Sequence, residues 1–125
     1  MQRTNFESLR VYRLAEDLSD KIWRIVVRWR GLTRDTVGTQ LVRAADSIGA
    51  NVAEGSGRGT ATDNRRFVLM ARGSLYETKH WLRRAYQRQI LTSDEVTELR
   101  ILVDSLTQVL NGYLRSLNTR RKRGE

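Results

Sequence analysis

The chain has 125 residues, a length that suits a single domain with its own core. It contains no cysteine, which excludes disulfide frameworks and cysteine-based metal sites. It shows neither the apolar core of a signal peptide nor a run of the roughly 20 apolar residues that span a membrane, so we expect a cytoplasmic protein without a membrane partner. The 23 basic residues outnumber the 14 acidic ones, for a formal net charge of +9. That excess attracts polyanions, although a merely solubilising surface explains the same composition.

The first predicted helix carries an apolar stripe at alternating steps of four and three residues. Thr4 and Glu7, three residues apart, fit a capping box at its start, and Gly31 suits a helix end. The residues of the stripe are Val11, Ala15, Leu18, Ile22, Ile25, Trp29 and Leu32.

Three further helices follow, and the absence of proline favours long uninterrupted ones. We expect the second over about 35–54, rich in small residues that permit close packing, and the third over about 62–89. The fourth opens with a second capping box, Thr92 to Glu95. The expected inward residues are Val37, Leu41, Ala45, Ile48 and Val52, then Phe67, Ala71, Leu75, Thr78, Leu82 and Ala85, then Val96, Leu99, Val103, Leu106, Leu110, Tyr113 and Leu117.

Short connections make neighbouring helices antiparallel, so the predicted fold is all-α, an antiparallel up-down four-helix bundle. We place this single domain at residues 1–119 and expect a disordered basic tail at residues 120–125. Apolar residues also remain outside the inward stripes. Trp23 and Trp81 are therefore candidates for an oligomer interface, although one bundle could bury both.

The glycine-rich run at residues 54–59, "EGSGRG", invites comparison with a phosphate-binding loop. A Walker-type loop needs a preceding strand and a lysine, and neither is predicted here. We instead expect Gly55 to end the second helix, Gly57 and Gly59 to reverse the chain, and Thr60 or Thr62 to cap the third helix.

Catalytic and metal-binding patterns are weak. The lone histidine, His80, gives with Glu77 a single Glu-x-x-His copy, whereas di-metal bundles use paired copies. No serine has a histidine nearby in sequence to suggest a triad. We therefore predict a protein that is not an enzyme and has no cofactor or metal.

The basic residues form a pattern along the third helix, where Arg65, Arg72 and Lys79 recur every seven residues and Arg83 follows one turn later. A stripe of this kind can follow a phosphate backbone, although a solvated helix face remains the alternative. The candidate nucleic-acid-binding residues are Arg58, Arg65, Arg66, Arg72, Lys79, Arg83, Arg84, Arg120, Arg121, Lys122 and Arg123.

Residues 40–59, "QLVRAADSIGANVAEGSGRG", resemble the signature of the 23S ribosomal RNA intervening-sequence protein family, whose second helix reads like Q-L-R-R-A-A-x-S-I-x-x-N-I-A-E-G and turns into G-x-G-R. Val42 and Val52 depart from that pattern. The segments "FESLRVYRLAEDL" and "FVLMARGSLYE" look like the family too, so the resemblance covers about residues 6–117. It implies a ring-shaped homopentamer of four-helix bundles, similar in fold to the basic accessory variability determinant proteins of diversity-generating retroelements, which bind nucleic acid and a reverse transcriptase.

The polar members of this motif could satisfy one another at a bundle end or a subunit contact, so we interpret them as structural rather than catalytic. The candidate structural or oligomer-contact residues are Gln40, Arg43, Ser47, Asn51, Glu54, Gly55, Ser74, Glu77, Trp23 and Trp81.

Two functional hypotheses remain open. The first is an oligomer that binds RNA, DNA or a nucleoprotein through its arginines, alongside a nucleic-acid-processing protein as a candidate partner. The second is a scaffolding oligomer that binds an acidic protein, with no specific role for nucleic acid.

Overall fold

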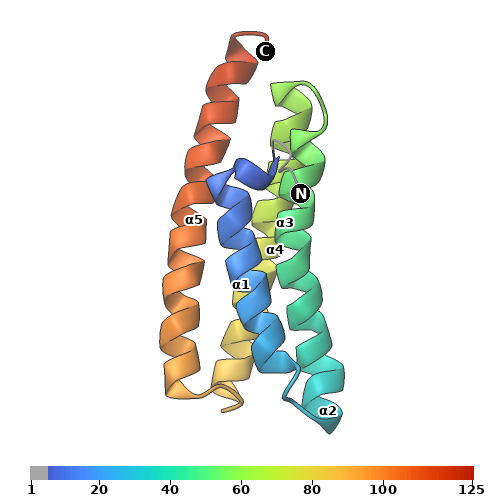
Figure 1. The fold of residues 1–125 in the computed structure, drawn as a ribbon, viewed down its shortest axis with the longest axis vertical. Helices are drawn as coiled ribbons and strands as arrows, with labels where there is room; N and C mark the ends of the chain where they lie inside the picture. Colours follow the sequence, from blue (N-terminus) through green and yellow to red (C-terminus); the bar gives the residue numbers. More distant parts are fainter. Residues whose placement is uncertain (1–5) are drawn as a thin grey trace.

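The computed structural model describes residues 6–125, and this part of the chain is helical with no strand (Figure 1). The expected all-α class is therefore confirmed. The elements are η1 (Phe6–Ser8), α1 (Arg10–Val26), α2 (Gly31–Thr33), η2 (Arg34–Gly38), α3 (Thr39–Ser56), α4 (Ala61–Gln87) and α5 (Ser93–Lys122).

Four of these helices, α1, α3, α4 and α5, lie side by side along the long axis of the molecule (Figure 1). Each packs on the helix that follows it, and α5 packs back on α1, which closes the bundle. Helix α5 ends beside the turn that joins α3 to α4 (Figure 1). The backbone N–H of Ala61 donates to the carbonyl oxygen of Glu125 over 2.9 Å, so the two segments are in direct contact.

The core follows the predicted stripes closely. Leu18, Ile48, Leu75 and Leu106 are among its fully buried side chains, one from each of the four long helices. The prediction differs on α4, where Val68 is buried and Phe67 only half-buried. Phe67 and Val68 stand four and three residues before the buried Ala71, and helical spacing allows either step, so the spacing alone does not decide between them.

Helix α1 ends earlier than predicted, at Val26 rather than Gly31. Gly31 instead begins the short α2 with a φ of +60°, and Leu32, expected inward, is 79% exposed. Thr4, half of the expected capping box, lies outside the described residues. The early end lets η2 return onto the bundle at Gly38, where an added Cβ would lie only 2.8 Å from Val26 Cγ1.

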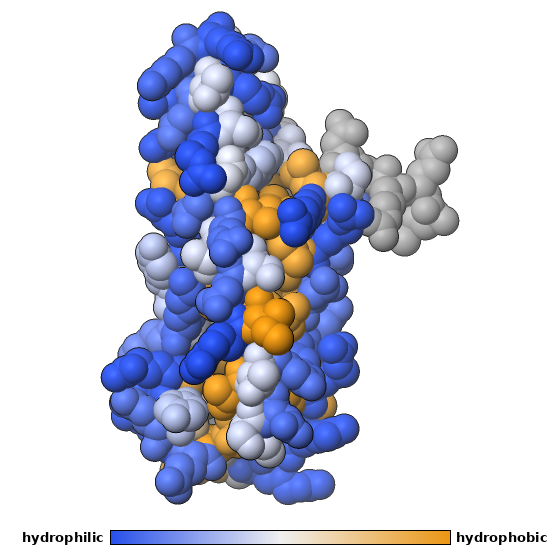
Figure 2. All heavy atoms as spheres, turned by 90° about the vertical axis from the view of Figure 1, so that its left-hand side faces the viewer, coloured by the Kyte–Doolittle hydropathy of each residue, from blue (hydrophilic) through white to orange (hydrophobic). Residues whose placement is uncertain are grey.

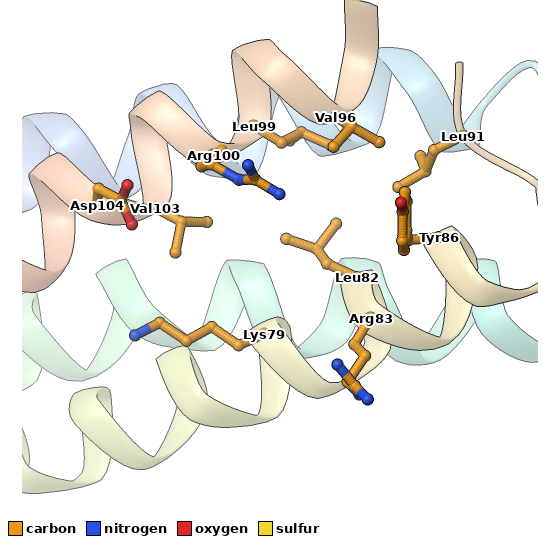
Figure 3. Close-up of a pocket in the computed structure, with 10 residues that line it drawn as sticks. All are labelled: Lys79, Leu82, Arg83, Tyr86, Leu91, Val96, Leu99, Arg100, Val103 and Asp104. Carbon is orange, nitrogen blue, oxygen red and sulfur yellow. The ribbon is translucent and has the colours of Figure 1, made fainter. Parts of the chain in front are cut away.

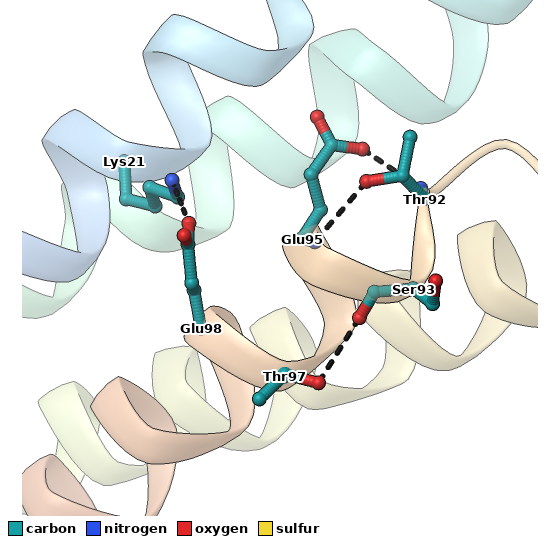
Figure 4. A network of polar contacts seen from close by, with 6 residues as sticks. All are labelled: Lys21, Thr92, Ser93, Glu95, Thr97 and Glu98. Atoms are coloured by element: carbon teal, nitrogen blue, oxygen red, sulfur yellow. Dashed lines mark hydrogen bonds and ion pairs between the residues drawn. The ribbon is translucent and has the colours of Figure 1, made fainter.

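The predicted starts of α4 and α5 are confirmed by their caps. The Thr60 hydroxyl accepts from the N–H of Asp63 over 3.2 Å at the start of α4. At the start of α5 the Thr92 hydroxyl accepts from Glu95 N–H over 3.1 Å, and the Glu95 carboxylate accepts from Thr92 N–H over 2.9 Å (Figure 4). One turn later an ion pair joins Glu98 to Lys21 of α1 (Figure 4).

The expected disordered tail at residues 120–125 is wrong for most of its length, because α5 continues to Lys122 and the last residues form a turn. Arg120, Arg121 and Lys122 occupy the last helical turn. Cationic side chains interact favourably with the negative end of a helix dipole, so the charges that suggested disorder stabilise the helix instead.

Helices α3 and α4 approach each other closely at Gly55. A Cβ added to this residue would lie 2.5 Å from Asn64 Oδ1, 2.9 Å from Asn64 O and 3.0 Å from Phe67 Cβ. Because the backbone of Asn64 cannot move away as a flexible side chain would, this position requires glycine. Gly55 thus belongs to the end of α3 and also sets the distance between the two helices.

A polar contact joins the same helices midway along α3. The Ser47 and Ser74 hydroxyls lie 2.9 Å apart, and the Asn51 amide donates to the Ser47 carbonyl over 2.9 Å and to its hydroxyl over 3.1 Å. All three side chains are half-buried. Because unpaired buried hydroxyls are costly, this cluster favours one register of α3 against α4.

Gly55→Ala should lower the free energy of unfolding by about 1–3 kcal/mol, because the new methyl group overpacks against Asn64. The matched control is Gly73→Ala on α4, where an added Cβ meets nothing within 4 Å. The free energy of unfolding of Gly73→Ala should equal that of the wild type or exceed it by up to about 1 kcal/mol, because alanine favours the helix more than glycine does. Urea denaturation measures both, and equal behaviour of the two variants would contradict the close approach at Gly55.

Ser47→Ala and Ser74→Ala should each destabilise the protein by about 0.5–1.5 kcal/mol, since each removes the half-buried hydrogen bond between the two hydroxyls. The double variant should lose less than the sum of the two, with a coupling of about 0.5–1.5 kcal/mol. A double-mutant cycle from denaturation curves measures this coupling. Strict additivity would show that the two hydroxyls do not interact.

Candidate nucleic-acid interface

Seven of the predicted nucleic-acid-binding residues lie in the segments that meet at one end of the bundle. The end of α5 and the start of α4 are tied there by the hydrogen bond between Ala61 and Glu125. We call this surface the basic end. Its predicted members are Arg58, Arg65, Arg66, Arg120, Arg121, Lys122 and Arg123.

The ring of Phe67 organises part of the basic end. The guanidinium carbons of Arg58 and Arg66 lie 4.6 Å and 4.9 Å from its centroid. Arg58 also pairs with Glu54 over 2.9 Å, and Arg66 lies 3.9 Å from Asp63. The aromatic contacts hold both guanidinium groups in place, while the carboxylates offset part of their charge. Phe67 was expected in the core, and its role as an arginine platform was not predicted.

Arg65 and Arg84 are less available than the sequence suggested. Arg65 is half-buried, and its Nε is buried without a hydrogen-bond partner among the described residues. Arg84 is also half-buried and donates to the Gln87 side chain over 2.7 Å. Neither residue points to a phosphate site on its own.

A second basic surface runs along α4, where the predicted Arg72, Lys79 and Arg83 share a face with two tyrosines. Tyr76 is 57% exposed and Tyr86 61% exposed, and Lys79 Nζ lies 5.2 Å from the centroid of the Tyr76 ring. The five residues follow steps of four, three, four and three, which place them on one face of the helix. We call them the α4 stripe. The tyrosines were missed because only charges were traced along this helix, although the same spacing includes them.

The α4 stripe borders a groove between α4 and α5 with a volume of about 420 Å³. Its apolar lining is Leu82, Leu91, Val96, Leu99 and Val103. Figure 3 shows the Tyr86 ring beside Leu91, and Arg100 extending from α5 toward the space between the helices. Arg100 was not predicted as a candidate. Its charge joins those of Lys79 and Arg83 around this groove, which a single carboxylate, Asp104, also lines.

The groove between α1 and α3 has the opposite character. It is lined by Glu16, Asp20 and Asp46 together with Tyr12, and the Ser19 hydroxyl donates to the Asp46 carboxylate. Burial raises the pKa of Tyr12 above its ordinary value, and the negative charge of Glu16 raises it further. This groove is therefore unsuited to a polyanion, and the net charge of +9 is unevenly distributed over the bundle.

The remaining polar motif residues do not share one buried network. Arg43, Glu54 and Glu77 are exposed, and Gln40 is half-buried. Glu54 pairs with Arg58 at the basic end, whereas Arg43 lines a groove near Trp23. Ser47, Asn51, Gly55 and Ser74 lie at the contact of α3 with α4, as described above.

The two candidate interface tryptophans differ in their surroundings. Trp81 is half-buried against the core, with its ring edge-to-face on His80 at 4.8 Å between centroids. Trp23 is 56% exposed and, with Val27 and Val42, lines a groove of about 360 Å³. Trp23 is therefore the stronger of the two candidates for a contact between molecules.

On the α5 side of the molecule, hydrophobic residues show as a broken line framed by hydrophilic ones (Figure 2).

Residues 6–125 contain no group of three or more histidine, cysteine, aspartate or glutamate side chains placed to hold a metal ion. Within the same residues, no helix combines the length and the apolar character that crossing a membrane requires.

The chain is similar to a protein of unknown function from the S23 ribosomal protein family of Bacteroides thetaiotaomicron, whose crystal structure matches with a TM-score of 0.74 at 18% identity, over 83% of this chain and 97% of that one. This likeness concerns the fold. None of the curated proteins compared with the chain matches it. The model of the family described as 23S rRNA-intervening sequence protein matches residues 7–112, and the chain belongs to this family.

Proposed function

We propose that the protein is a non-enzymatic, cytoplasmic, basic oligomer that binds nucleic acid, with RNA or a nucleoprotein as its partner, through the basic end and the α4 stripe. The observation that carries this proposal is the α4 stripe itself, in which three cationic and two exposed aromatic side chains share one helix face.

The chemistry of the two surfaces suits a phosphate backbone and the bases attached to it. Guanidinium groups form paired hydrogen bonds to phosphate oxygens, and each neutralised phosphate releases counterions. Exposed aromatic rings add stacking on bases, which does not depend on the base sequence. Both contributions require side chains held at fixed positions on a rigid element, and α4 is such an element.

Self-association would multiply this charge. A ring of five copies, as the family resemblance implies, would carry five α4 stripes and bind one long polyanion at several points. The exposed Trp23 beside Val27 supports a contact between copies, because large aromatic side chains are enriched at protein interfaces. The contact surface and the basic surfaces then belong to different parts of the molecule.

The alternative is a scaffolding oligomer whose partner is a protein. The groove at Trp23, whose apolar lining is bordered by Arg43 and by the ion pair of Arg34 with Asp35, would also suit a partner with an apolar and acidic surface. Purification with and without nuclease separates the two functions. A protein partner stays bound after nuclease treatment, whereas a nucleic-acid partner is lost.

Replacing three cations of the α4 stripe, Arg72→Gln, Lys79→Gln and Arg83→Gln, should weaken RNA binding and flatten its dependence on salt. A plot of log Kobs against log salt concentration should lose about 0.7–0.9 in slope for each phosphate contact removed. Fluorescence anisotropy with labelled RNA, repeated over a salt series, measures both quantities.

The matched control removes the same charge from three exposed arginines on and just after α1, through Arg13→Gln, Arg24→Gln and Arg28→Gln. This triple should change the slope far less. If both triple variants lose the same amount of salt slope, net charge alone attracts RNA. If the wild-type protein does not bind RNA even at low salt, the proposed function itself is contradicted.

A further inference from the structure

The groove between α4 and α5 combines features that the basic end does not show. Its lining is apolar, its volume is about 420 Å³, and Tyr86 lines it beside Leu91 (Figure 3). Arg83 of α4 and Arg100 of α5 line its two sides, with Arg100 directed toward α4 and the Arg83 guanidinium on the outer side of α4 (Figure 3). Small-molecule sites in proteins have volumes of about 300–1,000 Å³, so the space is sufficient for a single nucleobase.

We propose that this groove binds unpaired nucleotides of a single-stranded RNA segment, with a base stacked on Tyr86 and the adjoining phosphates on Arg83 and Arg100. The inference deepens the proposed function and rests on it. It adds the class of nucleic acid and the place where one base is held.

The α4 stripe extends this site along the strand. Tyr76 and Tyr86 are ten residues apart on one helix, which corresponds to about 15 Å, or about four nucleotides at a stacked spacing of about 3.4 Å. Lys79 lies between them with its ammonium group near the Tyr76 ring. A strand that follows the stripe would therefore meet an aromatic ring at each end and cations between them.

Helix geometry favours a single strand over a duplex. Axes of packed helices are about 8–10 Å apart, so the groove between them is narrow. Within a duplex the bases are stacked on one another, and their faces cannot reach the ring of Tyr86 without unpairing. Unpaired bases expose those faces, and stacking platforms of this kind are typical of proteins that bind single strands.

The test compares a labelled oligouridine of about 12 nucleotides, within the range of about 4–16 nucleotides bound by known single-strand modules, with an RNA duplex of the same length. The oligouridine should bind more tightly. Tyr86→Ala should weaken its binding about 5- to 100-fold, the loss typical of one stacked base, and leave the salt slope unchanged. Tyr86→Phe keeps the ring and should bind like the wild type.

Ile101→Ala is the control for a lost exposed apolar side chain, since Ile101 is 62% exposed on α5 and does not line the groove. It should bind RNA normally. Sedimentation of every variant shows whether the assembly state is unchanged. Photo-crosslinking of 4-thiouridine RNA, read by mass spectrometry, should place the label on α4 and α5 residues around Tyr86.

Several outcomes overturn the inference while leaving the proposed function intact. These are tighter binding of the duplex, normal oligouridine binding by Tyr86→Ala, and crosslinks confined to the basic end. A change in sedimentation of Tyr86→Ala without a change in RNA affinity per assembled molecule also overturns it, because Tyr86 would then be an assembly residue. If neither probe binds at low salt, the proposed function fails together with the inference.

Discussion

The close approach of α3 to α4 is the constraint on which the rest of the bundle depends. It requires glycine at position 55, where any Cβ would meet the backbone of Asn64, and it brings Ser47 within hydrogen-bond distance of Ser74. Small residues allow the contact and the hydroxyl pair favours its register. With one side of α4 fixed in this way and another side packed on α5, the remaining face of α4 is held at a defined orientation toward solvent.

The fixed orientation of α4 connects the packing of the bundle with the chemistry of its surface. The α4 stripe projects cations and tyrosines from a helix whose core residues, such as Val68 and Leu75, are fully buried. The basic end is held differently, by Phe67 under two guanidinium groups and by the contact between Ala61 and Glu125. The buried core residues of α4 and the backbone contact between Ala61 and Glu125 are not screened by salt, so they keep both helix segments in place where the surface charges are screened.

Most of the fold could be predicted from the sequence, because apolar spacing and capping residues are local signals. The capping box at Thr92 and Glu95 and the cap at Thr60 are clear examples. The early end of α1 could not be predicted, since it depends on the contact of Gly38 with Val26, which is distant in the sequence. The helical structure of residues 120–122 was not predicted, because the cluster of basic residues was interpreted as a disordered tail rather than as the last turn of a helix. Most of the charged residues of the site were predicted. Arg100 and Tyr86 became candidates because the structure places both around one groove, and Tyr76 because its exposed ring lies near Lys79.

The central claim is that nucleic acid contacts one part of this bundle and not its whole basic surface. Arginine modification with phenylglyoxal, in the presence and absence of RNA and read by mass spectrometry, tests it most directly. The account predicts that RNA protects Arg72, Arg83 and Arg100 around α4, as well as the arginines of the basic end. Arg13, Arg24 and Arg28 on the α1 side should react equally in both conditions. Uniform protection of all exposed arginines, or protection confined to the α1 side, would contradict the account.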